Sequence, residues 1–311
     1  RRQRQMCIRD RYMYTSKDNV LLAIKRKKDT RATYLRNAEL TYSREHYNGI
    51  SYNAVIRNFR EYATDYARFD RIGADGAVTP VRKYDMTELE LKFRYGKNEK
   101  FYQTHDERIP ITYDALIFNL EHTMSKKGFL GSSYDYHRTE LGIQKRLWFS
   151  AFGFVDVIGK AGKVWNKVPY PLLILPNANL TYTIQPEAYT NMNAIEFIND
   201  EYISWDVTYY MNGLILNRLP LIKKLKWREV LCFRGLWGHL TDKNNPMKTG
   251  EGLYAFPVGS GVMGHAPYME ASVGIENIFK FMRLDYVWRL NYRDHPGIQK
   301  RGIRCTMSLS F

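Results

Sequence analysis

Alternation of apolar and polar side chains, repeated through most of the sequence, constrains the fold more than any other feature. The chain ends in GIRCTMSLSF, where one parity is apolar and the other is polar. The apolar parity comprises Ile303, Cys305, Met307, Leu309 and Phe311. Successive side chains of a β-strand point to opposite faces, so this pattern predicts a strand with one apolar face. A terminal strand that ends in Phe needs an explanation, because the ends of soluble domains usually fray.

The same alternation recurs upstream and predicts an all-β, antiparallel fold. It is clearest at residues 282–292, 268–276, 202–211 and 88–95. Weaker patterns cover 19–28, 32–47, 51–63, 111–125, 136–149, 153–165 and 227–240. Together with the terminal strand these make about twelve strands. Many reach the roughly 9 to 11 residues that a tilted strand needs to cross a bilayer, and several exceed the five or six usual in soluble sheets.

Charged residues occupy the polar parity of the clearest strands. In a soluble sandwich this parity faces water, whereas in a membrane barrel it lines a wet lumen and the apolar parity faces lipid. Tyr and Trp near strand ends, such as Tyr95, Trp165 and Tyr292, favour the barrel because these side chains suit membrane interfaces. We therefore expect nine residues to face the lumen: Glu88, Glu90, Arg94, Asp206, Glu270, Glu276, Arg283, Asp285 and Arg289.

The connections between predicted strands differ in length on the two sides of the sheet. Three of the five on one side are tight, namely 277–280, 150–153 and the Asn48-Gly49 turn. The other side receives the long segments 241–265, 166–200, 126–135 and 64–83. Short turns at one end and long loops at the other are typical of outer-membrane β-barrels.

The overall composition indicates a folded chain but does not indicate which class of partner the chain binds. The chain is 44% apolar and 14% aromatic, with a formal net charge of +15. Such a positive charge suits nucleic acid, anionic lipid or lipopolysaccharide about equally. No run of eighteen apolar residues exists, so the sequence predicts no membrane-spanning helix.

Residues with catalytic or metal-binding chemistry are scattered. Cys7, Cys232 and Cys305 form neither a disulfide framework nor a metal-ligand spacing. The seven histidines include no HExxH motif and no paired metal spacing. We expect no enzymatic activity, no metal and no cofactor.

The first eleven residues, RRQRQMCIRDR, carry five Arg against one Asp and resemble a translated sequencing adapter. We interpret residues 1–11 as a non-native tract and exclude them from reasoning about the fold. Residues 12–311 are then one barrel domain, and we expect that the chain begins partway through a longer protein.

Three segments resemble the C-terminal barrel of a Bacteroidota outer-membrane family, in which a carboxypeptidase-regulatory-like domain precedes a barrel domain of unknown function. They are GLILNRLPLIKKLKWREV at 213–230, VPYPLLILP at 168–176 and the final 44 residues, 268–311, which are the most specific. The resemblance implies an integral protein of the Gram-negative outer membrane, with a signal peptide and a periplasmic domain upstream. It implies no established activity, which leaves transport, assembly or a surface scaffold as the expected roles.

The same resemblance implies the partners. They are outer-membrane lipid and lipopolysaccharide, together with the outer-membrane assembly machinery, which reads a terminal strand such as Ile303–Phe311. Nucleic acid is not expected as a partner.

The long segment 166–200 begins with an apolar, proline-rich run that includes Pro169, Tyr170, Pro171 and Pro176. Exposure of so much apolar surface to water is unfavourable, so we expect this loop to fold into the lumen. It precedes the fifth-from-last strand, where the sixteen-stranded insertase and two-partner-secretion superfamily carries a loop that enters the lumen. That superfamily's Arg-Gly-aromatic tip is missing here.

Three alternatives therefore stay open. The chain is a complete barrel of twelve strands, or it is the C-terminal part of a sixteen-stranded barrel of the insertase or secretion type. The third is a soluble all-β binding protein, in which the apolar parity would face a protein core.

Deletion of Phe311 tests the interpretation of the terminal strand. We expect the deletion to lower barrel assembly, because the final aromatic would be part of the strand that the assembly machinery pairs with. Heat-modifiable mobility on a gel measures the folded fraction, and a fraction equal to that of the wild type would contradict this reading.

Overall fold

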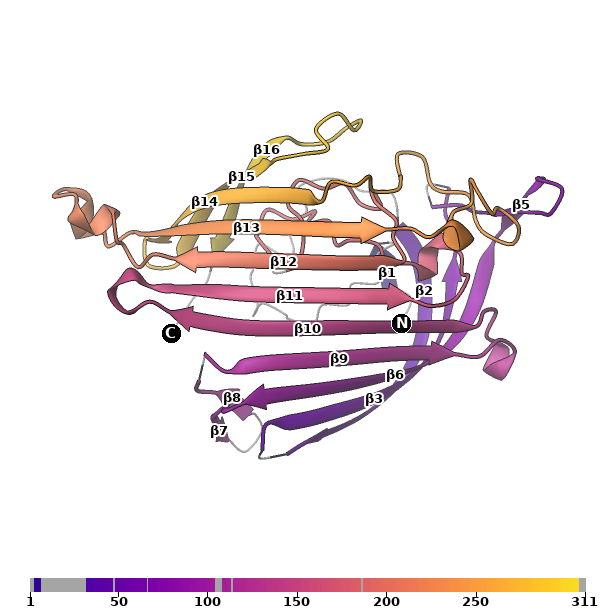
Figure 1. Cartoon of the computed structure of the whole chain (residues 1–311), viewed down its shortest axis with the longest axis horizontal. Helices are drawn as coiled ribbons and strands as arrows, with labels where there is room; N and C mark the ends of the chain where they lie inside the picture. The colour runs from indigo at the N-terminus through magenta and orange to yellow at the C-terminus, as the bar shows by residue number, and fades with distance from the viewer. Residues whose placement is uncertain are drawn as a thin grey trace.

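The computed structural model describes residues 3–6, 32–46, 48–65, 67–103, 108–112, 114–185 and 187–307. These residues form one twelve-stranded antiparallel sheet whose strands pair in chain order, plus two small hairpins (Figure 1). The sheet strands are β1 (Gln3–Met6), β2 (Ala32–Glu45), β3 (Ile50–Tyr62), β6 (Lys83–Lys97), β9 (Leu116–Ser125), β10 (Tyr136–Trp148), β11 (Phe154–Val164), β12 (Glu201–Tyr210), β13 (Arg228–His239), β14 (Tyr268–Ile278), β15 (Met282–Arg289) and β16 (Arg301–Met307). The hairpins are β4 (Phe69–Ile72) with β5 (Val78–Val81), and β7 (Phe101–Gln103) with β8 (Arg108–Pro110).

The predicted all-β antiparallel fold is confirmed. Every predicted strand has a counterpart except 19–28, which lies outside the described residues. Helical structure in the described ranges is limited to 3₁₀ turns of three or four residues, and none of these helices is long and apolar enough to cross a membrane. The short strand β1 pairs with β2 and lies within the tract 1–11 that the sequence reasoning set aside.

Two strands start five residues from the predicted position: β6 starts at Lys83 rather than at Glu88, and β9 starts at Leu116 rather than at residue 111. Before residue 88 the apolar parity switches, because Tyr84 and Met86 are buried on the same face as Glu88. The alternation of the sequence therefore breaks at this point although the strand continues. The inward-facing Tyr84 packs against Phe59 and Phe69, which explains the switch.

The sheet is strongly curved but open over the described residues. β1 and β16 are its two edges, and they pair only with β2 and β15 respectively. The predicted closure into a cylinder is therefore not present in this part of the structure. β1 pairs only with Ala32–Leu35, so Arg36–Glu45 of β2 also lie at the edge of the described sheet.

The two faces of the sheet differ in polarity: the exposed outer face is largely apolar, and the covered inner face carries charged residues. On the outer face, apolar side chains of adjacent strands form continuous rows, and one row crosses β9 to β13 through Leu120, Leu141, Ala161, Ile203 and Trp237. Exposed fractions in that row reach 42% at Leu141 and 52% at Ile203. The inner face carries buried charged residues instead, among them several of the predicted lumen-facing set.

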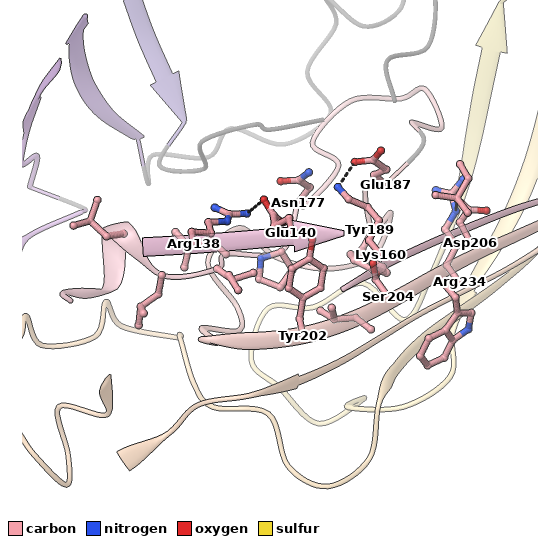
Figure 2. A pocket seen from close by; sticks show the side chains of 18 of the residues that line it. Arg138, Glu140, Lys160, Asn177, Glu187, Tyr189, Tyr202, Ser204, Asp206 and Arg234 are labelled. Atoms are coloured by element: carbon pink, nitrogen blue, oxygen red, sulfur yellow. Dashed lines mark hydrogen bonds and ion pairs between the residues drawn. The ribbon is translucent and has the colours of Figure 1, made fainter. Parts of the chain in front are cut away.

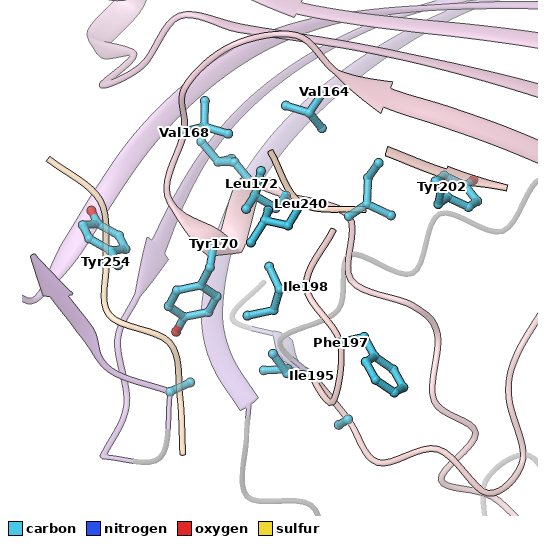
Figure 3. Packing of buried hydrophobic residues seen from close by; sticks show 14 of the residues in the cluster. Val164, Val168, Tyr170, Leu172, Ile195, Phe197, Ile198, Tyr202, Leu240 and Tyr254 are labelled. Carbon is cyan, nitrogen blue, oxygen red and sulfur yellow. The ribbon is translucent and has the colours of Figure 1, made fainter. Parts of the chain in front are cut away.

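A hydrophobic core lies on the inner face, between the sheet and the loops that cover it (Figure 3). Tyr170, Leu172, Ile195, Phe197 and Ile198 come from the connection between β11 and β12 and are almost completely buried. The core thus consists largely of loop residues packed against the polar side of a sheet. Apolar loop side chains pack on one another while the strand charges pair around them.

The two ends of the sheet differ as the sequence predicts. Tight turns such as 149–153 and 279–281 lie at one end, and the long connections that follow β3, β9, β11 and β13 lie at the other (Figure 1). The β4–β5 hairpin belongs to the long-loop end.

Gly153 in the tight turn between β10 and β11 offers a test of the fold. Its φ of 92° lies in the left-handed region, and an added Cβ would overlap the carbonyl oxygen of Tyr210. We expect Gly153→Ala to destabilise the folded state by about 1–3 kcal/mol, because strained backbone has that cost. Gly159 on β11 has open space around its Cα, so Gly159→Ala is the matched control and should change little. Thermal unfolding in detergent measures both, and equal effects would contradict the turn geometry.

Candidate functional site

The segment between β11 and β12, residues 165–200, is here termed the inner loop. It crosses the inner face of the sheet and is buried along most of its length. Pro169, Tyr170, Pro171 and Pro176, the residues predicted for a luminal loop, are all buried in it. The segment therefore occupies the space that a lumen would enclose.

Arg234 on β13 holds the middle of the inner loop. Its Nη1 donates hydrogen bonds to the carbonyl oxygens of Gln185 and Ala188, both at 2.9 Å. Its Nε lies 2.7 Å from Oδ2 of Asp206 on β12, so the charge is paired where it is buried. The arginine thus links the loop backbone to two adjacent strands.

Glu270 on β14 binds the next part of the loop through its carboxylate. It accepts hydrogen bonds from the backbone N–H groups of Thr190, at 2.9 Å, and Asn191, at 2.6 Å. The hydroxyl of Tyr268 donates to the same carboxylate at 2.6 Å. Glu270 is only 2% exposed, so the loop supplies the hydrogen bonds that a buried carboxylate needs.

Two arginines complete the anchoring at β15 and β16. Arg289 makes a two-pronged ion pair with Glu196 of the loop, at 2.6 and 3.0 Å, and neither side chain is more than 1% exposed. Arg304 donates to the carbonyl oxygen of Thr190 at 2.8 Å and to Oδ1 of Asn191 at 3.2 Å. Charge-assisted and two-pronged bonds of this kind are among the strongest that side chains make.

A small cavity remains between the inner loop and strands β10 to β13 (Figure 2). Its volume is about 70 Å³, enough for a few water molecules. Ion pairs line it, with Arg138 2.6 Å from Glu140 and Lys160 2.8 Å from Glu187 of the loop. The described part of the inner loop therefore fills most of the space beside these four strands.

Glu196 is the anchoring group whose protonation the surroundings control. Burial alone would raise the pKa of this carboxyl, but hydrogen bonds from Arg289 and from the backbone N–H of Asn193 hold the pKa below its ordinary value of 4.5. Nδ1 of His295 also lies 2.8 Å from Oε1 of Glu196. The carboxylate form is thus favoured in the folded chain.

The predicted lumen-facing residues all lie on the inner face, and the structure brings three of them to the inner loop. Glu270 and Arg289 contact the loop directly, and Asp206 acts through Arg234. On β6, Arg94 pairs with Glu99 at 2.7 Å, and Glu90 lies near Arg57 and Lys92, away from the loop anchors. Buried Glu88, Asp285 with its ion-paired partner Arg283, and the partly buried Glu276 complete the set.

Sequence reasoning missed Arg234, Arg304 and Glu196 as anchors. Arg234 and Arg304 lie on the polar parity of predicted strands. Arg289 was predicted to face the lumen from the same criterion, a charged residue on the polar parity, which therefore applies to them as well. Glu196 lies in a loop, where no periodicity marks its direction.

The residues predicted as an assembly signal are only partly described. Ile303 is 64% exposed on the outer face, and Cys305 and Met307 are partly buried. Leu309 and Phe311 lie outside the described residues.

The described ranges contain no group of three or more His, Cys, Asp or Glu side chains able to hold a metal ion.

Comparison with family models matches residues 35–245 to the C-terminal domain of a family of unknown function, DUF5686. The chain belongs to this DUF5686 family. The family description assigns no activity, and it says nothing of a Bacteroidota source or of a carboxypeptidase-regulatory-like domain. Curated proteins gave no significant match.

Comparison with solved structures supports the β-rich architecture. Among 56 matching chains, one is the crystal structure of BamA from Haemophilus ducreyi lacking POTRA domains 1–3. The TM-score is 0.53 at 8% sequence identity, over 89% of this chain and 54% of that one. The DUF5686 chain thus spans about half of the BamA chain and resembles it in fold alone.

Glu196 provides a pH test of loop anchoring. Because its pKa is lowered, the carboxylate stabilises the anchored loop above pH 4.5, and this contribution is lost as the pH falls below that value. Glu196→Gln leaves Arg289 buried without its charge partner and should cost about 3–5 kcal/mol. Hydrogen–deuterium exchange of residues 190–198, corrected for intrinsic rates, should therefore rise below pH 4.5 in the wild type and be high at every pH in the variant.

The control is Glu201→Gln, which breaks the part-exposed pair with Lys163 and should cost no more than about 1 kcal/mol. Equal protection of the loop in Glu196→Gln and Glu201→Gln would contradict the anchoring role.

Proposed function

We propose that this chain is an integral outer-membrane β-barrel domain whose interior is filled by the inner loop, so that it does not form an open pore at rest. Its work in the membrane is gated transport, assembly of other proteins or a surface scaffold. Outer-membrane lipid, lipopolysaccharide and the assembly machinery are the partners that this role requires.

The observation that carries the proposal is the inverted polarity of the sheet. Rows of apolar side chains on the outer face are exposed, while carboxylates and guanidinium groups on the inner face are buried. The contiguous apolar area over five strands is much larger than the area of the single exposed apolar residues that are common on soluble proteins. Large patches of this kind mark sites of contact with proteins or membranes. Hydrocarbon contact would stabilise the outer rows, while ion pairs such as Arg234–Asp206 and Arg289–Glu196 stabilise charges on the inner face.

The edge of the apolar band supports a lipid environment. Directly beyond the row of Leu120, Leu141, Ala161, Ile203 and Trp237, the same strands carry a polar row on the same face. It consists of His122, Thr139, Lys163, Glu201 and His239. Next to it the indole of Trp165 is 54% exposed, in the manner of interfacial aromatics. A change from apolar to polar within one row fits the boundary between hydrocarbon and headgroups.

The insertase or secretion type is the second candidate. Two observations favour it: the similarity of the fold to BamA, and the position of the inner loop before β12, the fifth-from-last strand of the described sheet. In that case the edge of the described sheet at β1 and β2 would pair with further strands of a larger cylinder.

Planar-bilayer recordings separate an occluded barrel from a permanently open one. We expect little conductance from the intact chain and a clear increase after deletion of residues 170–195, because the anchored loop fills the interior. A large conductance before deletion would contradict the proposal, and a soluble protein would give no conductance in either case.

The lipid-facing role of the outer face is testable by a pair of substitutions on β13. Phe233 lies inside the apolar band and His239 lies in the polar row, on the same face. We expect Phe233→Arg to lower the stability of the protein folded in lipid vesicles by about 2–4 kcal/mol, and His239→Arg to change it by at most about 1 kcal/mol. Urea titration in vesicles measures both, and a Phe233→Arg effect no larger than that of His239→Arg would contradict lipid contact.

A further inference from the structure

Four loops meet at the long-loop end of the sheet. Two backbone hydrogen bonds join the β4–β5 hairpin to the loop after β13. The N–H of Ile72 donates to the carbonyl oxygen of Leu253 at 2.9 Å, and the N–H of Ala255 donates to the carbonyl oxygen of Asp70 at 2.8 Å. The hydroxyl groups of Tyr134, from the loop after β9, and Tyr254 lie 2.8 Å apart. The inner loop joins this group through the hydroxyl of Tyr170, which donates to the carbonyl oxygen of Arg68. These hydrogen bonds hold the four loops together as one packed surface at this end of the sheet.

Two adjoining cavities open between these loops, with volumes of about 620 and 610 Å³. They share Arg71, Tyr134 and Lys167 in their walls, so they form one cleft. Each volume lies within the roughly 300–1,000 Å³ typical of small-molecule sites. This basic cleft is separate from the small cavity under the inner loop.

The first cavity of the basic cleft has an excess of positive charge. Four cationic side chains, Arg71, Lys83, Lys127 and Lys167, line it against the single carboxylate of Asp135. All four cations are exposed, and none forms an ion pair with another residue of the described ranges.

Asp135 offsets these cations only in part, because its charge is shared between Lys127 of the cleft and Lys126 outside it. Nζ of Lys126, outside the cleft, lies 3.3 Å from its Oδ1, and the backbone N–H of Lys127 donates to it at 3.1 Å. That backbone hydrogen bond and Lys126 lower the pKa of the carboxyl, so it stays charged and occupied. The second cavity adds one further carboxylate, Glu251. The balance in the cleft therefore favours an anion with more than one charge.

Three tyrosines line the cleft, of which Tyr134 is partly exposed and Tyr84 and Tyr254 are buried behind it. Tyr84 and Tyr134 pack edge to face with ring centroids 6.1 Å apart, and Tyr254 is hydrogen-bonded to Tyr134. Burial raises the pKa of Tyr134, so its hydroxyl stays protonated and able to donate or accept. Aromatic rings offer an apolar surface to a sugar ring, while lysine and arginine bind phosphate oxygens through charge-assisted hydrogen bonds.

We propose that the basic cleft binds a phosphorylated saccharide, with the phosphates on Arg71, Lys127 and Lys167 and the sugar against Tyr134. The binding chemistry stands on the cleft itself. That the cleft lies at the surface side of a membrane rests on the proposed function. There the saccharide would be either part of a glycolipid headgroup or free in solution.

Calorimetric titration of the full chain in detergent tests the proposal, with glucose 1,6-bisphosphate as the probe. We expect saturable binding that weakens with added salt, because exposed charges are screened. The Lys127→Gln/Lys167→Gln double variant should bind at least tenfold more weakly. Lys248→Gln is the matched control, since Lys248 lies at the same end and pairs with Asp242 outside the cleft, and it should bind like the wild type.

Three results would overturn the proposal: no binding of the bisphosphate, equal binding of unphosphorylated glucose, or equal binding by the double variant with an unchanged folded fraction. A second arm uses vesicles that contain lipid A or its dephosphorylated form. Preference for phosphorylated lipid A assigns the site to a headgroup, and binding of the soluble bisphosphate without this preference assigns it to a free sugar phosphate. If the chain proves soluble while the bisphosphate still binds, the membrane proposal fails and the binding proposal stands.

Discussion

The pairing of buried charges between the inner loop and the inner face of the sheet determines the rest of this structure. A buried carboxylate or guanidinium group is strongly unfavourable unless a partner of opposite charge and hydrogen bonds satisfy it. Arg289 with Glu196, and Glu270 with the backbone of Thr190 and Asn191, meet that requirement. Because the polar parity of the strands is committed to the inside, the apolar parity has no protein core left to enter. It faces outward, where the proposed membrane would cover it with hydrocarbon.

The strands were predictable because the period-two pattern is local and repeats over ten or more residues in many of them. The prediction was weakest where the environment changes along a strand, as at Tyr84 and Met86, whose burial under loop residues reverses the apolar parity of β6. The burial of Pro169 and Tyr170 followed from composition alone, since an apolar loop avoids water. Glu196, Arg71 and Lys167 were not predictable, because loops distant in sequence bring their partners together and no periodic signal records this.

The loops have two separate tasks in this account. Their inner portions pack on the inner face of the sheet, through the hydrophobic core around Tyr170 and Phe197 and through the arginine anchors. Their outer portions meet at the long-loop end and present exposed cations that form no ion pair with the described residues, beside the partly exposed ring of Tyr134. Tyr170 belongs to both parts, since its ring is in the core and its hydroxyl binds the segment that leads to the β4–β5 hairpin.

The central claim is that lipid hydrocarbon contacts the outer face of the sheet. A nitroxide scan along β12, residues 201–210, in lipid vesicles measures this contact directly by comparing relaxation from oxygen, which concentrates in hydrocarbon, with relaxation from a water-soluble nickel complex. The account predicts high oxygen accessibility at positions 203, 205, 207 and 209, and shielding from both reagents at 202, 204, 206 and 208. Preferential access of the nickel complex to the odd positions, or equal shielding of both parities, would contradict it.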